Sequence, residues 1–170
     1  PRAAERLGGS ETPDTEVLEA RILRGRVFRF AGKREQAKKA LAMSADTAHQ
    51  HAAADIEGQA RLGLARLFLE GMPAQGAGRG EALRDGRAAA EAVIGIARGL
   101  GDHAMEAAAE GILGELAYRS EDWEGALLSL ARQEDLWQSI GRLGNQVDVA
   151  LRSSRVATRC ESWQDGLADA

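Results

Sequence analysis

An internal repeat with a period of about forty residues constrains this chain more than any other feature of its sequence. The clearest copy spans residues 105–136, where Leu113-Gly114 lies in the middle of one apolar-periodic helix and residues 120–123 begin a second helix. The first helix recurs elsewhere with a small residue at the same place, at spacings of 38, 51 and 40 residues. These mid-helix residues are Gly25, Gly63, Gly114 and Ser154. The pattern predicts a row of helix-turn-helix units.

Small residues also recur in the second helices. A small residue lies twelve residues after each mid-helix residue, if an insertion in the second unit is allowed for. A leucine or alanine follows four residues later, on the same face of the helix. The pairs are Ala37 and Leu41, Ala88 and Ala92, Ala126 and Leu130, and Gly166 and Ala170. A glycine inside a helix costs about 1 kcal/mol relative to alanine. Three glycines in register therefore indicate that the two helices of each unit approach closely.

The repeats predict one domain over residues 1–170, with units at about 14–50, 51–101, 102–141 and 142–170. Residues 1–12 are expected to end a preceding helix, and a cap at residues 12–14 to start the next one. In the second unit, a third helix is expected from His51 to Glu70, followed by a loop at 71–80 that is rich in glycine. In the last unit, a second helix is expected to start at residues 161–165. The open pattern at both ends suggests a piece of a longer protein.

Composition supports an all-α fold, because the hydrophobic residues are mostly alanine and leucine and only 4% of the chain is aromatic. No apolar run is long enough to span a bilayer, so we expect no membrane partner and a cytoplasmic location. A net charge of -4 argues against nucleic acid as a partner. Cys160 is the chain's one cysteine, which excludes an internal disulfide and favours a packing role for this residue.

The repeat resembles the tetratricopeptide family. Leu62-Gly63 and Leu113-Gly114 match the dipeptide of its first helix, Phe28 matches its aromatic position, and Ala37 and Ala126 match its second-helix alanine. Arg24, Arg66 and Ala117 depart from that pattern, and the longer period is similar to divergent repeats in bacterial multidomain regulators. The resemblance implies a right-handed α-solenoid of antiparallel helix pairs, about three and a half units long. It also implies a concave groove, lined by the first helices, that binds proteins or peptides.

In that family the groove positions lie one, four and five residues after the mid-helix residue. Here these positions are Arg26, Arg29, Phe30, Leu64, Leu67, Phe68, Glu115, Tyr118, Arg119, Arg155, Thr158 and Arg159. The groove is thus predicted to have basic ends and an apolar centre at Leu64 and Phe68, with Tyr118 turned from packing to recognition. Such a surface suits a peptide with acidic flanks and an apolar anchor, since arginines pair with carboxylates and Phe30 and Phe68 offer a pocket.

No set of residues predicts catalysis, a cofactor or a metal site. His49 and His51 point to different sides of a helix, and the glycines at 76, 78 and 80 lack the preceding strand and Lys-Ser/Thr of a phosphate loop. We therefore expect a non-catalytic protein-interaction module, the regulatory part of a larger protein. The alternatives are a structural spacer or a homo-oligomer that stacks through its open ends, and, less favoured, a small-molecule sensor.

Overall fold

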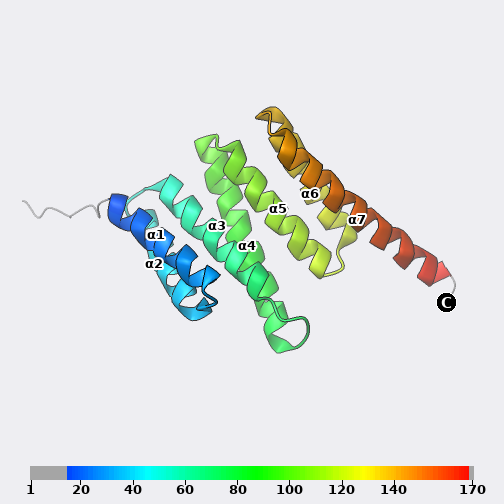
Figure 1. Cartoon of the computed structure of the whole chain (residues 1–170), viewed down its shortest axis with the longest axis horizontal. Helices are drawn as coiled ribbons and strands as arrows, with labels where there is room; N and C mark the ends of the chain where they lie inside the picture. Colours follow the sequence, from blue (N-terminus) through cyan, green and yellow to red (C-terminus); the bar gives the residue numbers. More distant parts are fainter. Residues whose placement is uncertain (1–14, 169–170) are drawn as a thin grey trace, which may run out of the picture.

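The computed structural model describes the backbone of residues 15–168 and the side chains of residues 15–161, and this part is helical throughout, without a strand (Figure 1). The helices are α1 (Thr15–Phe30), α2 (Arg34–Gln50), α3 (Ala54–Gly71), α4 (Ala77–Leu100), α5 (His103–Arg119), α6 (Trp123–Ser139) and α7 (Leu143–Ala168). The all-α prediction is confirmed. No helix in the described part has a stretch apolar and long enough to cross a membrane.

The helices pack in chain order and form a row that begins at α1 and ends at α7 (Figure 1). Each helix contacts the next one along the chain, and α3 also contacts both α1 and α5. Among the described residues, no pair of even-numbered helices makes a comparable contact. The odd helices therefore form one layer of the row and the even helices another.

The core is divided into three clusters, each shared by three consecutive helices. The first joins α1, α2 and α3 around Leu41, the second joins α3, α4 and α5 around Val93, and the third joins α5, α6 and α7 around Leu130. Each even helix thus packs between two odd helices. The side chains are small, so the helices approach closely enough for single glycines and alanines to decide the fit.

The same type of turn forms five of the six connections between the described helices. Its central residue has a positive φ of 54° to 71°, and the next N–H donates to the carbonyl five residues earlier at 2.9 to 3.0 Å, the pattern of a Schellman motif. The central residues are Gly32, Ala52, Gly101, Glu121 and Gly141. Their spacings are 20, 49, 20 and 20 residues. The turns, rather than the glycines inside helices, mark the period of the chain.

The turn at Ala52 corrects the predicted register of the second unit. The helix expected from His51 begins at Ala54 instead. Counting thirteen residues from the turn residue gives Ala65 in α3, as it gives Gly114 in α5, so Gly63 lies two residues before the true equivalent. Contacts agree, because Gly25 and Gly114 face the following helix of their own pair, whereas Gly63 faces Leu41 of the preceding helix α2.

The α3–α4 connection is shorter than the predicted loop at 71–80. α3 ends at Gly71, and α4 begins at Ala77. The guanidinium of Arg79 donates hydrogen bonds to the carbonyls of Ala74 and Arg119, and these bonds hold the first turn of α4 despite its glycines. In α2 and α6, the small residue and the residue four positions further on lie at fixed distances before the turn residue that follows the helix. Counting the same distances back from Gly101 gives other equivalents in α4 than the predicted Ala88 and Ala92. The correct residues are Gly86 and Ala90.

The predicted second helix of the last unit is wrong, because α7 continues without a break to Ala168. A turn twenty residues after Gly141 would put Glu161 at positive φ, a conformation that costs a residue with a β-carbon about 1–2 kcal/mol. Ala52 and Glu121 accept that cost at the equivalent turns, so the cost alone does not explain why α7 continues. The expected helix tail at 1–12, the cap at 12–14 and the side chains of Trp163, Gly166 and Ala170 lie outside the described residues.

Candidate functional site

Charged side chains from all four odd helices meet on one surface, which we call the odd-helix face. A groove of about 370 Å³ on it is formed by residues of α3, α5, α6 and α7. The residues that line the groove are Arg66, Leu69, Glu70, Ala108, Gly111, Ile112, Glu115, Gln133, Trp137 and Arg152. A second groove, of about 380 Å³, continues between α1 and α3 past Arg26 and Gln59. The charged residues of the odd-helix face are Glu16, Glu19, Arg26, Arg29, Arg66, Glu70, Glu115, Arg119 and Arg152.

Three arginines gather where α1 meets α3. Arg29 Nη1 lies 3.0 Å from Glu70 Oε1, and its side chain is only 10% exposed. Its Nε has no hydrogen-bond partner. Burial lowers the pKa of Arg66, and so do the charges of Arg29 and Arg26, while Glu70 opposes them. The Arg66 guanidinium is therefore close to two other guanidinium groups and to the carboxylate of Glu70, and positive charge is in excess around it.

Arg119 links α5 to the end of α3. Its Nε lies 3.0 Å from Glu115 Oε1, and its Nη1 donates a hydrogen bond of 2.6 Å to the carbonyl of Leu69. From the other side, Arg34 donates to the carbonyls of Glu70 and Gly71 at 2.9 and 3.1 Å. The last carbonyls of α3 are thus satisfied by arginines of two other helices, which fixes the position of α3 on this face.

On the α7 side, Arg152 forms the far wall of the 370 Å³ groove. Its Nη2 donates a 2.7 Å hydrogen bond to Gln133 Oε1, and its Nε lies 3.1 Å from Asp148 Oδ2. Gln133 belongs to the even helix α6, yet it reaches the groove past Gly111, which has no side chain to block it. The bottom of the groove is therefore neutral and polar, with Trp137 beside it.

The structure does not place the predicted apolar centre, Leu64 and Phe68, in the groove. Leu64 packs against the α1–α2–α3 core cluster, and Leu67 is buried. Phe68 lies toward the even helices, with Lys38 Nζ 5.2 Å from its ring centroid and Gly86 of α4 close to its Cβ. The groove offsets counted from Ala65 instead give Arg66, Leu69 and Glu70, all of which line the groove. The centre of the face is charged because the register of α3 differs by two residues from the predicted one.

Tyr118 takes part in packing. Its ring meets Trp123 edge to face at a centroid distance of 5.5 Å, and the guanidinium of Arg155 lies 5.5 Å from the Tyr118 centroid. Both aromatic residues border the α5–α6–α7 core cluster. Arg155 and Arg159 are exposed on α7. Tyr118 also lines a small pocket with Glu115 and Arg152, and its recognition role stays a prediction.

Phe30 lies at the other end of the row and is 81% exposed. The guanidinium of Arg29 lies 4.7 Å from the centroid of its ring, a cation–π contact at an exposed site. This pair ends α1 beside the arginine cluster that surrounds Glu70. Of the predicted aromatic groove residues, Phe30 alone presents a free ring face within the described part of the chain.

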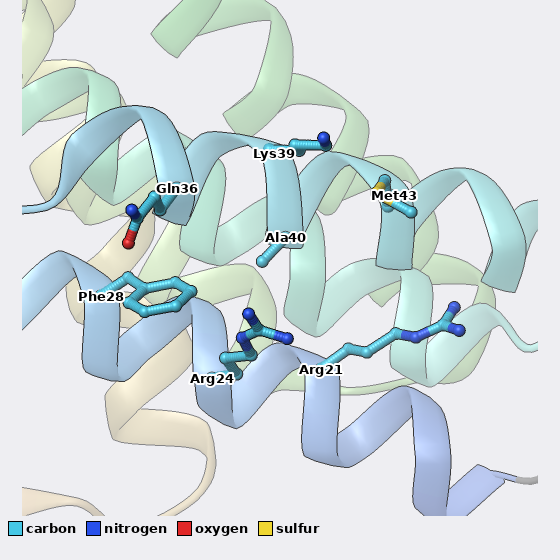
Figure 2. Close-up of a pocket in the computed structure, with 7 residues that line it drawn as sticks. All are labelled: Arg21, Arg24, Phe28, Gln36, Lys39, Ala40 and Met43. Carbon is cyan, nitrogen blue, oxygen red and sulfur yellow. The ribbon is translucent and has the colours of Figure 1, made fainter.

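A separate basic groove of about 340 Å³ lies between α1 and α2 (Figure 2). Arg21, Arg24 and Lys39 line it together with Phe28 and Met43, and the Arg24 guanidinium lies 5.1 Å from the Phe28 centroid. Its arginines lie on the same helix as Arg26 and Arg29 but in a different groove. They therefore serve as matched controls for the odd-helix face.

A buried carboxyl group lies between α4, α5 and α6. Glu110 is 1% exposed, and its Oε1 lies 4.0 Å from Arg98 Nη2 and 3.9 Å from Arg132 Nη1. Its Oε2 has no hydrogen-bond partner. Burial raises the pKa of this carboxyl, and the two arginines only partly offset that effect. Neither arginine closes a hydrogen bond, so Glu110 is a strained core position rather than part of a site.

The described residues bring together no group of three side chains that could hold a metal ion. His49, considered as a ligand from the sequence, has its Nδ1 3.1 Å from Glu57 Oε2. No protein-family model matches the chain, and no curated protein matches its sequence. The tetratricopeptide resemblance therefore remains a prediction.

Proposed function

We propose that this chain is a non-catalytic protein-interaction module that binds an acidic segment of a partner protein across its odd-helix face. In this proposal the helix pairs are tetratricopeptide-like, their row winds as a right-handed solenoid, and the odd helices line its concave side. The module would form the regulatory part of a larger bacterial protein in the cytoplasm. The observation that carries the proposal is the arginine row that α1, α3, α5 and α7 bring together.

Charge supports an acidic partner. With Glu16 and Glu19 of the second groove included, the odd-helix face holds five arginines and four glutamates, although the whole chain has a net charge of -4. Arg66 is partly desolvated among like charges, and this disfavours its charged form. A partner carboxylate placed between Arg66 and Arg26 would relieve that cost. Guanidinium groups bind carboxylates through two parallel hydrogen bonds, which adds geometric selectivity to the attraction.

The groove also offers an apolar contact. Leu69, Ile112 and Trp137 line it between Arg66 and Arg152. A partner side chain such as leucine would cover these residues while acidic neighbours on either side meet the two arginines. The partner expected from the sequence, a peptide with acidic flanks and an apolar anchor, is therefore kept, while the anchor position moves from Phe30 and Phe68 to Leu69 and Trp137.

The test is binding of labelled peptides with a central leucine and flanks of aspartate and glutamate, measured by fluorescence anisotropy. Reversing two charges, Arg26→Glu with Arg66→Glu, should weaken binding at least tenfold. The control pair Arg21→Glu with Arg24→Glu changes the charge equally on the same end of the molecule and should weaken binding less than threefold. Equal losses from the two pairs, or no loss from the first, would refute the assignment of the face.

A second candidate is a structural unit that joins chains through its ends, including homo-oligomers. The exposed apolar residues of the terminal helices favour it, namely Leu23 and Val27 on α1 and Leu143, Val147 and Leu151 on α7. Light scattering over a range of concentrations tests self-association. If the protein is a monomer at all concentrations, self-association is excluded and peptide binding is the remaining proposal. An enzyme or a small-molecule sensor has no comparable observation behind it.

A further inference from the structure

An amide side chain lies at the floor of the 370 Å³ groove on the odd-helix face. Gln133 of α6 is only 5% exposed, and a Cβ at Gly111 of α5 would lie 2.9 Å from its Cδ. The amide is thus packed against the backbone of α5, where any side chain larger than that of glycine would displace it. Both helices have neighbours on either side within the row, so this contact is set by the described helices alone.

The orientation of this amide is fixed by Arg152. The Oε1 atom of Gln133 accepts a 2.7 Å hydrogen bond from Arg152 Nη2. Because an arginine side chain only donates, this bond identifies the oxygen of the amide and leaves Nε2 as a donor. Within the described part of the chain, Nε2 has no acceptor.

A segment that fills the groove must deal with this donor. While the groove is open to solvent, water can solvate the amide, but a bound segment excludes that water. A buried N–H group without an acceptor weakens binding, because its desolvation is then uncompensated. The segment that binds here is therefore expected to bring a hydrogen-bond acceptor to Gln133 Nε2.

The fold itself does not require an amide at this position. The equivalent residues, eight positions before the turn residue that follows each even helix, are Ser44 in α2 and Val93 in α4. Both are fully buried. Val93 has no polar side-chain group, and the Ser44 hydroxyl donates to the carbonyl of Ala40 in its own helix at 2.9 Å. Among the described even helices, α6 alone carries at this register a donor that the protein leaves without an acceptor.

The floor around Gln133 favours a neutral acceptor. Leu69, Ala108, Ile112 and Trp137 line the groove with it, and their side chains are apolar or aromatic. A carboxylate among them would lose its water in exchange for one neutral donor, whereas a main-chain carbonyl carries no net charge. The acidic side chains of the partner therefore fit the arginines of the groove walls, and its main chain fits the floor.

We infer that Gln133 donates a hydrogen bond from Nε2 to a main-chain carbonyl of the bound segment, which crosses this groove in an extended conformation. Inside a helix the carbonyls already accept from N–H groups four residues later, whereas an extended segment leaves them free. The inference rests on the proposed function, because it concerns the same acidic segment with its leucine anchor. It adds a residue of an even helix that selects the conformation of the partner.

The first test uses the labelled leucine peptide with acidic flanks in fluorescence anisotropy. Gln133→Met keeps a long, unbranched side chain but has no donor, and it should weaken binding at least fivefold. The control is Gln138→Met, at an exposed position of the same helix, which should change the affinity less than twofold. Circular dichroism and urea unfolding show whether both variants are folded.

Peptides in which one peptide bond at a time is replaced by an ester identify the carbonyl that Gln133 contacts, because an ester carbonyl is a weaker acceptor. One position near the leucine should cost at least threefold in affinity for the unchanged protein and nothing further for the Gln133→Met protein. A variant that only repacks the groove does not produce this coupling. A peptide locked as a helix by a bridge between side chains four residues apart should bind at least tenfold more weakly than the open peptide.

The inference is overturned if the helix-locked peptide binds as tightly as the open one, or if the ester series gives the same losses on both proteins. Its failure differs from the failure of the proposed function. If Arg26→Glu with Arg66→Glu weakens binding but Gln133→Met does not, only this inference is wrong. If no peptide of the series binds the unchanged protein, both are wrong.

Discussion

Replacing Gly25 with alanine should destabilise the protein, although the same change in an open helix stabilises it. Alanine is favoured over glycine inside a helix by about 1 kcal/mol. At Gly25 the new Cβ would lie 2.7 Å from Leu41 Cγ and 2.8 Å from Leu41 Cδ2. Leu41 has no room to withdraw, because its Cδ2 is 2.9 Å from the Cβ position of Gly63. Overpacking of this kind costs about 1–3 kcal/mol, so we expect a net loss of about 1 kcal/mol.

Urea unfolding followed by circular dichroism measures this change in the free energy of unfolding. A double-mutant cycle with Leu41 tests whether the contact with Leu41 causes it. Leu41→Ala removes the obstacle at a cost of about 2–5 kcal/mol, and Gly25→Ala in that background should then stabilise by about 1 kcal/mol. The control is Gly95→Ala in α4, where no atom lies within 4 Å of the Cβ position and a gain of about 1 kcal/mol is expected. If Gly25→Ala stabilises the unchanged protein as much as the control does, the close approach of α1 and α2 is wrong.

Three further predictions concern the turns, the buried carboxyl and the odd connection. Glu121→Gly should raise the free energy of unfolding by about 0.5–1 kcal/mol, because φ is 64° there, whereas Gly141→Ala, at φ 69°, should lower it by about 1 kcal/mol in the same urea titration. Because the Glu110 carboxyl binds its proton more tightly in the folded than in the unfolded protein, its contribution to the free energy of unfolding falls as pH rises above 4.5. Glu110→Gln should make that fall smaller and raise the free energy of unfolding by about 1 kcal/mol at pH 7. A steeper fall with pH in the variant would contradict this. Three residues inserted after Pro73 should cost less than about 1 kcal/mol, while the same insertion after Glu121 should cost several times more, as thermal unfolding would show.

Helix content and most helix ends could be predicted from the sequence, because leucine and alanine recur with helical spacing and glycines mark three of the turns. The turn at Ala52 could not be predicted from the sequence, because an alanine between a histidine and another alanine gives no indication of a positive φ. Gly63 then looked like the equivalent of Gly25, although the two glycines contact Leu41 from different helices, α3 and α1. A glycine shows that a neighbour is close without showing which neighbour it is.

The same shift decided how much of the candidate site could be predicted. Arg26, Arg29, Glu115 and Arg119 were placed on the odd-helix face because α1 and α5 carry visible glycines at the reference position. Arg66 could have been found by counting from the turn at Ala52, because it follows Ala65 directly, as Arg26 follows Gly25.

Gln133 and Trp137 could not have been predicted by groove offsets at all. They come from an even helix, and Gln133 reaches the groove past Gly111, which has no side chain to block it. Such a contribution depends on the packing of two helices rather than on the spacing of residues within either one.

The connection between α3 and α4 gives the chain one place where its length can change. α3 takes its register from the turn at Ala52 behind it, and α4 takes its register from the turn at Gly101 ahead of it. Because neither register passes through residues 72–76, residues gained or lost there leave the packing on both sides as it was. Selection for length therefore acts on this segment almost independently of selection for fit. Among proteins that share this arrangement, differences in length should collect between these two helices, and the other turns should keep theirs.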